Sequence, residues 1–162
     1  MAYRRVVGVR RVVTGVDERG RSTVIADGEA FGGDTWAEVW VSDPGRGLDA
    51  VVDPRDGPMV LEPPAGGTAW RVFAVPPDAV LRERLARTAA AIPGMEPDGF
   101  HATDTVDYVL VLEGEIGLEL DTGEVTLRTG DCVVQRGTRH AWRNRGDRPV
   151  RMAAVMLSTR PA

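Results

Sequence analysis

Residues 101–114 read HATDTVDYVLVLEG and residues 130–144 read GDCVVQRGTRHAWRN, and these two stretches decide the fold. They contain the only two histidines of the chain, His101 and His140. In each stretch, short runs rich in valine and other apolar residues end at turns that contain glycine. Short strands separated by such turns are typical of an antiparallel sandwich or barrel. The two stretches therefore predict an all-β unit.

The rest of the chain is predicted to add strands, a long loop and one helix. Residues 12–16 and 22–26 flank an Asp-Glu-Arg-Gly turn, which is typical of a hairpin. Residues 43–67 are rich in proline and glycine and predict a loop. Apolar residues at three- and four-residue spacings over 79–92 predict one amphipathic helix that packs against a sheet. The remaining strands are predicted over 35–42, 69–75, 105–112, 115–120, 124–128, 132–135, 139–144 and 150–157.

The first stretch resembles the first motif of the cupin superfamily, in which a pair of histidines precedes an acidic residue and a glycine. His101 takes the place of the first histidine, Asp107 replaces the usual glutamate, and Gly114 stands at the motif's glycine. The second stretch resembles the second cupin motif, with Gln135 in the place of its proline. The residues that match this second motif directly are Gly130, Gly137, His140 and Asn144.

More narrowly, both stretches are similar to small single-domain cupins with a conserved barrel, many of which are found beside natural-product pathways. The resemblance implies an all-β cupin fold, the double-stranded β-helix or jelly-roll barrel, with one short helix before the first motif. It implies a single domain over residues 1–162. Within that domain, N-terminal strands and a loop would span 1–77, the helix and a turn 78–94, and the motif core 99–158.

Strand geometry brings candidate metal ligands together. Because side chains on a strand alternate between two faces, His101 shares a face with Thr103, and His140 shares a face with Trp142. If these strands face each other across a barrel, two imidazoles and the carboxylate of Asp107 converge inside it. This set suits one divalent transition metal, Fe, Mn, Ni or Zn, and leaves positions open for substrate. Thr103 stands where most metal-binding cupins have a further histidine ligand, so a metal-free barrel with hydrogen-bonded histidines stays open.

The same residues predict a small-molecule enzyme with His101, His140 and Asp107 as catalytic residues. The expected chemistry is that of a divalent-metal-dependent lyase or isomerase, namely a decarboxylase, cyclase or dehydratase, or that of an oxygenase. The expected substrate is a polyketide-like or aromatic metabolite. Two alternatives stay open: a non-catalytic metabolite-binding barrel, and a metal-free enzyme that uses His101 or His140 for acid–base chemistry.

Four residues are candidates for the lining of the substrate pocket: Thr103, Gln135, Trp142 and Arg71. Gln135 would either hydrogen-bond a substrate carbonyl or brace its turn, and Trp142 would either wall the pocket or belong to the core. Arg71 would either anchor a substrate carboxylate or lie at the surface.

Three more residues are expected to be structural rather than functional. Asn144 is expected to fix the turn over residues 145–147, because asparagine side chains bond to nearby backbone groups. Tyr108 follows Asp107, so it should face away from that residue and contribute to packing. Cys132 has no neighbouring partner for nucleophilic catalysis and is expected to be buried and inert.

Composition narrows the partners and the compartment. A net charge of -4 argues against nucleic acid as a partner. No apolar run approaches the roughly 20 residues that span a bilayer, so no membrane partner is expected. One cysteine and the absence of a secretory pattern predict a cytoplasmic location. The cupin resemblance also implies a homodimer, for which residues 3–14 are the candidate contact.

Overall fold

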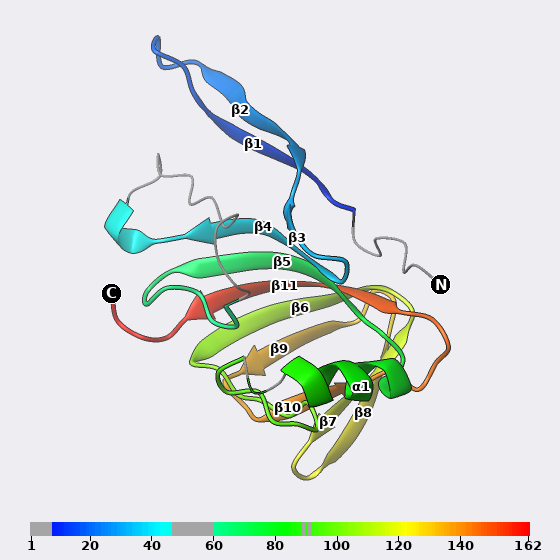
Figure 1. The fold of residues 1–162 in the computed structure, drawn as a ribbon. Coiled ribbons are helices and arrows are strands. Elements are labelled where there is room, and N and C mark those ends of the chain that lie inside the picture. The colour runs from blue at the N-terminus through cyan, green and yellow to red at the C-terminus, as the bar shows by residue number, and fades with distance from the viewer. Residues whose placement is uncertain (1–7, 47–59, 89, 91) are drawn as a thin grey trace.

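The computed structural model describes residues 8–46, 60–88, 90 and 92–162, and the strands of this part are arranged in three antiparallel sheets (Figure 1). The elements are β1 (Arg10–Val16), β2 (Ser22–Glu29), β3 (Phe31–Gly32), β4 (Trp36–Ser42), η1 (Pro44–Arg46), β5 (Thr68–Val75), α1 (Asp78–Thr88), β6 (Thr105–Glu113), β7 (Glu115–Leu120), β8 (Gly123–Arg128), β9 (Cys132–Arg136), β10 (His140–Arg143) and β11 (Val150–Ser158).

The barrel consists of a six-stranded sheet and a three-stranded sheet. The strand order is β3-β4-β5-β11-β6-β9 in the larger sheet and β10-β7-β8 in the smaller one. Two neighbouring inner strands of the larger sheet, β6 and β11, alternate buried and more exposed residues, as strands do when one face meets a core. The main hydrophobic core joins the two sheets, with Val111, Met152 and Ile116 almost wholly buried in it. The predicted all-β fold is confirmed.

The glycines of the two motifs lie at turns that require them. Gly114, between β6 and β7, has a φ of 102°, and Gly137, between β9 and β10, has a φ of 64°. Residues with a side chain rarely adopt this left-handed region. At Gly137, a β-carbon would also lie 3.1 Å from the carbonyl oxygen of Thr103.

The predicted helix is present but shorter than the sequence pattern suggested. It begins at Asp78 and ends at Thr88, whereas the apolar spacing predicted a helix to residue 92; residues 89 and 91 lie outside the described residues. Leu85 is buried, and Leu81 packs against the main core. The backbone of Asp78 donates to the carbonyl of Asn144, which fixes the start of α1 against the end of β10.

The predicted strands are all present, with ends that differ by a few residues. The two-residue strand β3 was not predicted, because a pair of residues carries no periodic pattern. In the predicted loop, residues 44–46 form a short 3-10 turn and residues 47–59 lie outside the described residues. The predicted hairpin, β1 and β2, stands clear of the barrel in Figure 1.

Candidate functional site: a histidine pair in the barrel

The two histidines lie against each other. His101 and His140 form an isolated antiparallel bridge, in which the backbone N–H of each donates to the carbonyl of the other, at 3.0 and 2.9 Å. Their ring centroids are 4.3 Å apart. His140 is buried, and His101 is partly buried. The sequence prediction that residues 39 positions apart would meet in one site is therefore correct for these two.

Backbone carbonyls determine which nitrogen of each ring carries hydrogen. Nδ1 of His101 lies 3.1 Å from the carbonyl oxygen of Gly99, and Nδ1 of His140 lies 2.9 Å from that of Thr138. A carbonyl oxygen only accepts hydrogen bonds, so each Nδ1 is the donor and carries the hydrogen. The Nε2 atom of each neutral ring is then left with a lone pair.

Both rings are uncharged at neutral pH. Burial, together with the neighbouring His140, lowers the pKa of His101 to about 4. Burial also lowers the pKa of His140, against the effect of its bond to the Thr138 carbonyl. Since a protonated imidazole offers no lone pair, these low values keep both Nε2 atoms available as acceptors.

Asp107 contributes a buried carboxylate on the inner face of β6. Its Oδ1 atom is buried and has no hydrogen-bond partner. Burial raises the pKa of Asp107, while the hydrogen bond from Thr105 and the charges of His101 and Arg71 act in the opposite direction. An unpaired buried carboxylate oxygen costs stability, roughly 1–3 kcal/mol, and such groups are frequent at functional sites.

The predicted three-residue metal site is not assembled as a cluster. Among the residues that the structure describes, no three histidine, cysteine, aspartate or glutamate side chains are grouped so that they could hold a metal ion. The two imidazoles fit an ion by their chemistry, because both are neutral and both have a free Nε2. Asp107 does not join them, and its role as a ligand stays a prediction.

Arg71 is buried in an ion pair and does not lie at the surface. Its Nε donates to Glu38 at 2.9 Å, and its Nη atoms donate to the carbonyls of Leu61 and Val60, both at 2.6 Å. Burial raises the pKa of Glu38, and the charge of Arg71 opposes that shift. With its donors directed at protein acceptors, Arg71 positions the segment at residues 60–61 instead of presenting a free guanidinium to a carboxylate.

Of the other predicted pocket residues, Trp142 contacts a histidine ring, whereas Thr103 and Gln135 bond to other residues. The hydroxyl of Thr103 is 2.7 Å from that of Thr105, so it is satisfied inside the protein. Gln135 is buried and its Nε2 donates to the carbonyl of Thr138 at 3.0 Å, which braces the turn before His140. Trp142 meets the ring of His140 edge to face, with centroids 5.6 Å apart, and also packs on the core.

Of the three residues expected to be structural, one prediction is confirmed and two need correction. Asn144 fixes its turn, because its Nδ2 donates to the carbonyl of Arg148 and its Oδ1 accepts from the N–H of Gly146. Tyr108 does face away from Asp107, but it is 53% exposed and does not pack in a core. Cys132 is exposed and not buried, since it lies on the same outward face of β9 as Val134.

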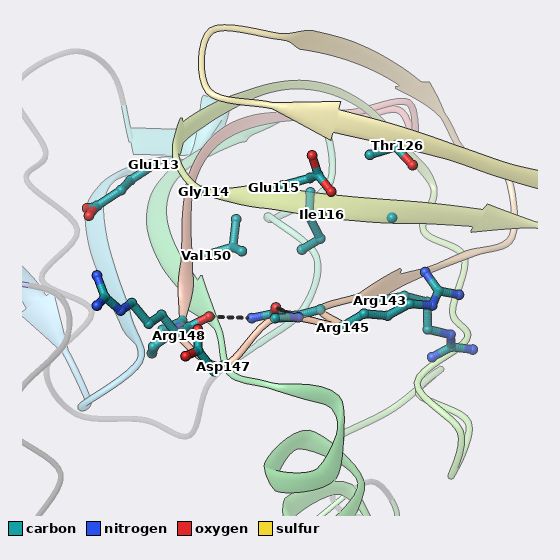
Figure 2. Close-up of a pocket in the computed structure, with 14 residues that line it drawn as sticks. Glu113, Gly114, Glu115, Ile116, Thr126, Arg143, Arg145, Asp147, Arg148 and Val150 are labelled. Carbon is teal, nitrogen blue, oxygen red and sulfur yellow. Dashed lines mark hydrogen bonds between the residues drawn. The ribbon is translucent and has the colours of Figure 1, made fainter.

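Sequence reasoning missed a pocket of about 520 Å³, which lies at the ends of β6 and β10 (Figure 2). Glu113 and Arg143, the last residues of those strands, line it, whereas His140 begins β10. Most of its charged groups are paired: Arg143 with Glu119, and Arg145 with Glu124.

Comparison with known proteins shows which family part of the chain resembles. Residues 91–156 match the family model described as Cupin domain. The chain is 51% identical over 63 residues to phomopsin biosynthesis cluster protein C′ of Diaporthe leptostromiformis, a match over 38% of this chain and 33% of the relative. Oryzines biosynthesis cluster protein J of Aspergillus oryzae is 46% identical over 70 residues, 43% of this chain and 38% of the relative. The cupin-domain-containing oxidoreductase virC of Hypocrea virens is 43% identical over 65 residues, 38% of this chain and 34% of the relative.

The chain thus spans about a third of the length of the curated relatives it matches. Among solved structures, a cupin domain of an XRE family transcriptional regulator from Enterobacter cloacae aligns with a TM-score of 0.40 and 19% identity, over 57% of this chain and 83% of that one. A cupin conserved barrel domain protein from Salinispora arenicola aligns with a TM-score of 0.41 and 20% identity, over 57% and 64%. The described residues include no helix long and apolar enough to cross a membrane.

Proposed function

Since residues 91–156 match the family model described as Cupin domain, we propose that the chain is a cupin-type biosynthetic enzyme that converts a small organic metabolite at the pair of His101 and His140. The relatives named above support a biosynthetic role, because two of them carry the words biosynthesis cluster in their names. The observation that carries the proposal is the pair of neutral imidazoles, each with its hydrogen held by a backbone carbonyl.

The chemistry of this pair selects what it can bind. With each Nδ1–H committed to a carbonyl, both rings present only acceptors to a bound molecule. Two adjacent acceptors suit either a divalent cation or a metabolite with hydroxyl or enol hydrogens. They disfavour a free carboxylate or phosphate, which needs donors. This agrees with the engaged guanidinium of Arg71, which is unavailable as an anion anchor.

A divalent transition metal is the cofactor that we propose for this site. His101 and His140 would hold it through Nε2, and Fe, Mn, Ni and Zn all accept imidazole ligands. When bound, such an ion would act as a Lewis acid toward a substrate oxygen. The pair alone leaves coordination positions open for water and substrate.

Asp107 is proposed to exchange a proton with the substrate. Burial raises its pKa, and a raised carboxyl pKa brings a general acid or base closer to neutral pH. Its unpartnered Oδ1 is free to accept a proton from a bound molecule. Together, these residues support lyase or isomerase chemistry, such as decarboxylation, cyclisation or dehydration of a polyketide-like or aromatic metabolite.

A redox reaction is the second candidate function. It is favoured by one observation, namely that relatives such as virC are named cupin-domain-containing oxidoreductases. The same pair of imidazoles would hold the metal in this case. The two candidates differ in their need for an oxidant, so turnover that requires dioxygen would identify the second.

To test the proposal, the untagged protein is added to a metabolite extract of the organism that encodes it. Mass spectrometry then follows the consumption of each metabolite. We expect at least one metabolite to be converted by the native protein and left unchanged by the His101→Gln and His140→Gln variants. The control is Arg87→Gln, a change in an exposed pair of α1. Tight binding of a metabolite without conversion would contradict an enzyme and identify the barrel as a binding module.

A further inference from the structure

Phe100, the residue before His101, packs between two arginines at the two ends of β10. The guanidinium carbon of Arg139 lies 3.9 Å from the centroid of the Phe100 ring, and that of Arg143 lies 5.1 Å from it. At such distances a guanidinium group is attracted to the face of an aromatic ring. Phe100 is buried as a result. The ring is therefore fixed beside the strand that carries His140.

Phe100 ends a tight turn over residues 96–100. The backbone N–H of Glu96 donates to the carbonyl of Phe100 at 2.8 Å, and that of Gly99 donates to the carbonyl of Glu96 at 2.9 Å. Gly99 has a φ of 90°, a left-handed conformation that glycine adopts readily. The carbonyl of the same glycine accepts from Nδ1 of His101. The 96–100 turn therefore determines where the hydrogen-bond acceptor of the His101 ring lies.

Arg139 fastens this turn to the smaller sheet. Its Nε and Nη2 atoms donate to the two carboxylate oxygens of Glu96, both at 2.7 Å. Its Nη1 donates to Asp121, between β7 and β8, at 2.7 Å. The paired bonds fix orientation as well as distance. The hydrogen bonds from Arg139 also hold the pKa of Glu96 below its usual value, so this carboxylate is charged at neutral pH.

These bonds matter because His101 does not belong to a strand. It meets His140 through an isolated bridge, and β6 begins only at Thr105. Residues in loops are held less firmly than residues within a sheet. Arg143 adds a further bond to the turn, from Nη1 to the carbonyl of Asp98 at 2.8 Å. The distance of 4.3 Å between the two histidine rings thus depends on the bonds that fix the turn.

We propose that Arg139 is a positioning residue: through Glu96 and Phe100, it fixes the backbone next to the histidine pair. Its loss would free the 96–100 turn from β10, so the two rings would no longer keep their spacing. The ion pair is partly exposed, with 38% of the Arg139 side chain accessible, so its loss should change global stability little and act locally. This inference rests on the proposed function, because it takes the histidine pair as the binding site.

Hydrogen–deuterium exchange, followed by NMR, tests the position of the turn without metal or substrate. The amide of His101 donates to the carbonyl of His140, so its exchange rate reports whether the two segments stay together. In Arg139→Gln and Glu96→Gln, we expect this amide to exchange about tenfold faster or more. The control is Arg145→Gln, which breaks an ion pair with β8 and should leave the rate unchanged. Unchanged exchange in the first two variants, or equal acceleration at the core amides of β11, would overturn the proposal.

Binding of Zn²⁺ separates this inference from the proposed function. By isothermal titration, Arg139→Gln is expected to bind Zn²⁺ about tenfold more weakly than the native protein, and Arg145→Gln as tightly as the native protein. Native affinity in Arg139→Gln would contradict the positioning role. If the native protein binds no Zn²⁺ while the exchange of the His101 amide responds as expected, the proposed metal site is refuted and the role of Arg139 is still supported.

Discussion

At the scale of single residues, the site is defined by hydrogen bonds that leave particular atoms free. The carbonyls of Gly99 and Thr138 hold the Nδ1 hydrogens of the two histidines and thereby expose Nε2. On Asp107, burial raises the pKa against the opposing effect of a hydrogen bond from Thr105, and Oδ1 has no partner. The protein thus keeps three atoms free to accept a proton, the two Nε2 atoms and Oδ1 of Asp107, and it loses stability in doing so.

The ionisation of His101 gives the first prediction. Its pKa of about 4 in the folded protein lies well below the 6.5 of a free histidine. Between these values the unfolded chain binds more protons than the folded chain, so stability should fall as the pH is lowered from 6.5 to 4. The loss attributable to this residue is up to about 3 kcal/mol. Two-dimensional NMR of the imidazole carbons measures the pKa of His101. A His101 resonance that titrates above pH 6 would contradict the lowered pKa.

Asp107 gives the second prediction, one of opposite effects on stability and activity. Asp107→Asn removes a buried charge whose pKa is raised by burial, so it should stabilise the fold at pH 7 by roughly 1 kcal/mol. It should also abolish conversion of the metabolite. The control is Asp104→Asn, an exposed carboxyl of the same segment. Urea unfolding measures the first effect, and a less stable Asp107→Asn protein would show that the carboxylate has a structural partner.

At the scale of elements, β4 and β5 are joined by a buried ion pair as well as by their antiparallel pairing in the sheet. Glu38 and Arg71 oppose each other in the sheet and are both buried. Arg71 also holds the carbonyls of Val60 and Leu61, which ties the segment before β5 to the barrel. Sequence reasoning selected Arg71 for its place on a strand, but it could not identify a partner 33 residues away.

Breaking this ion pair gives the third prediction. Arg71→Met leaves the carboxylate of Glu38 buried without a counter-ion, which should cost about 3–5 kcal/mol. Replacing both residues with methionine should recover most of that loss. Arg87→Met, which removes an exposed pair with Glu83, should cost about 0.5 kcal/mol or less. Urea unfolding measures the stability of the native protein and of these three variants. Equal losses for Arg71→Met and Arg87→Met would contradict a structural role for the buried pair.

At the scale of the whole molecule, the sequence predicted the features that follow from local residue patterns. It missed the features that depend on contacts between residues far apart in the chain. Short apolar runs that end at glycine turns predicted the β-strands, and the two motif histidines located the candidate site. Helix spacing does not show where a helix ends, so α1 was predicted too long. The exposure of Cys132 depends on how distant parts of the chain are arranged around β9, which no local pattern encodes.

The central claim is that His101 and His140 form the reaction site through their two free Nε2 atoms. Isothermal titration of untagged protein with Mn²⁺ and Zn²⁺ tests it most directly, because metal binding requires those atoms and no substrate. The account predicts about one equivalent bound by the native protein, and binding lost in both His101→Gln and His140→Gln while circular dichroism stays unchanged. Less than a tenth of an equivalent in the native protein, or unchanged binding in the two variants, would contradict it.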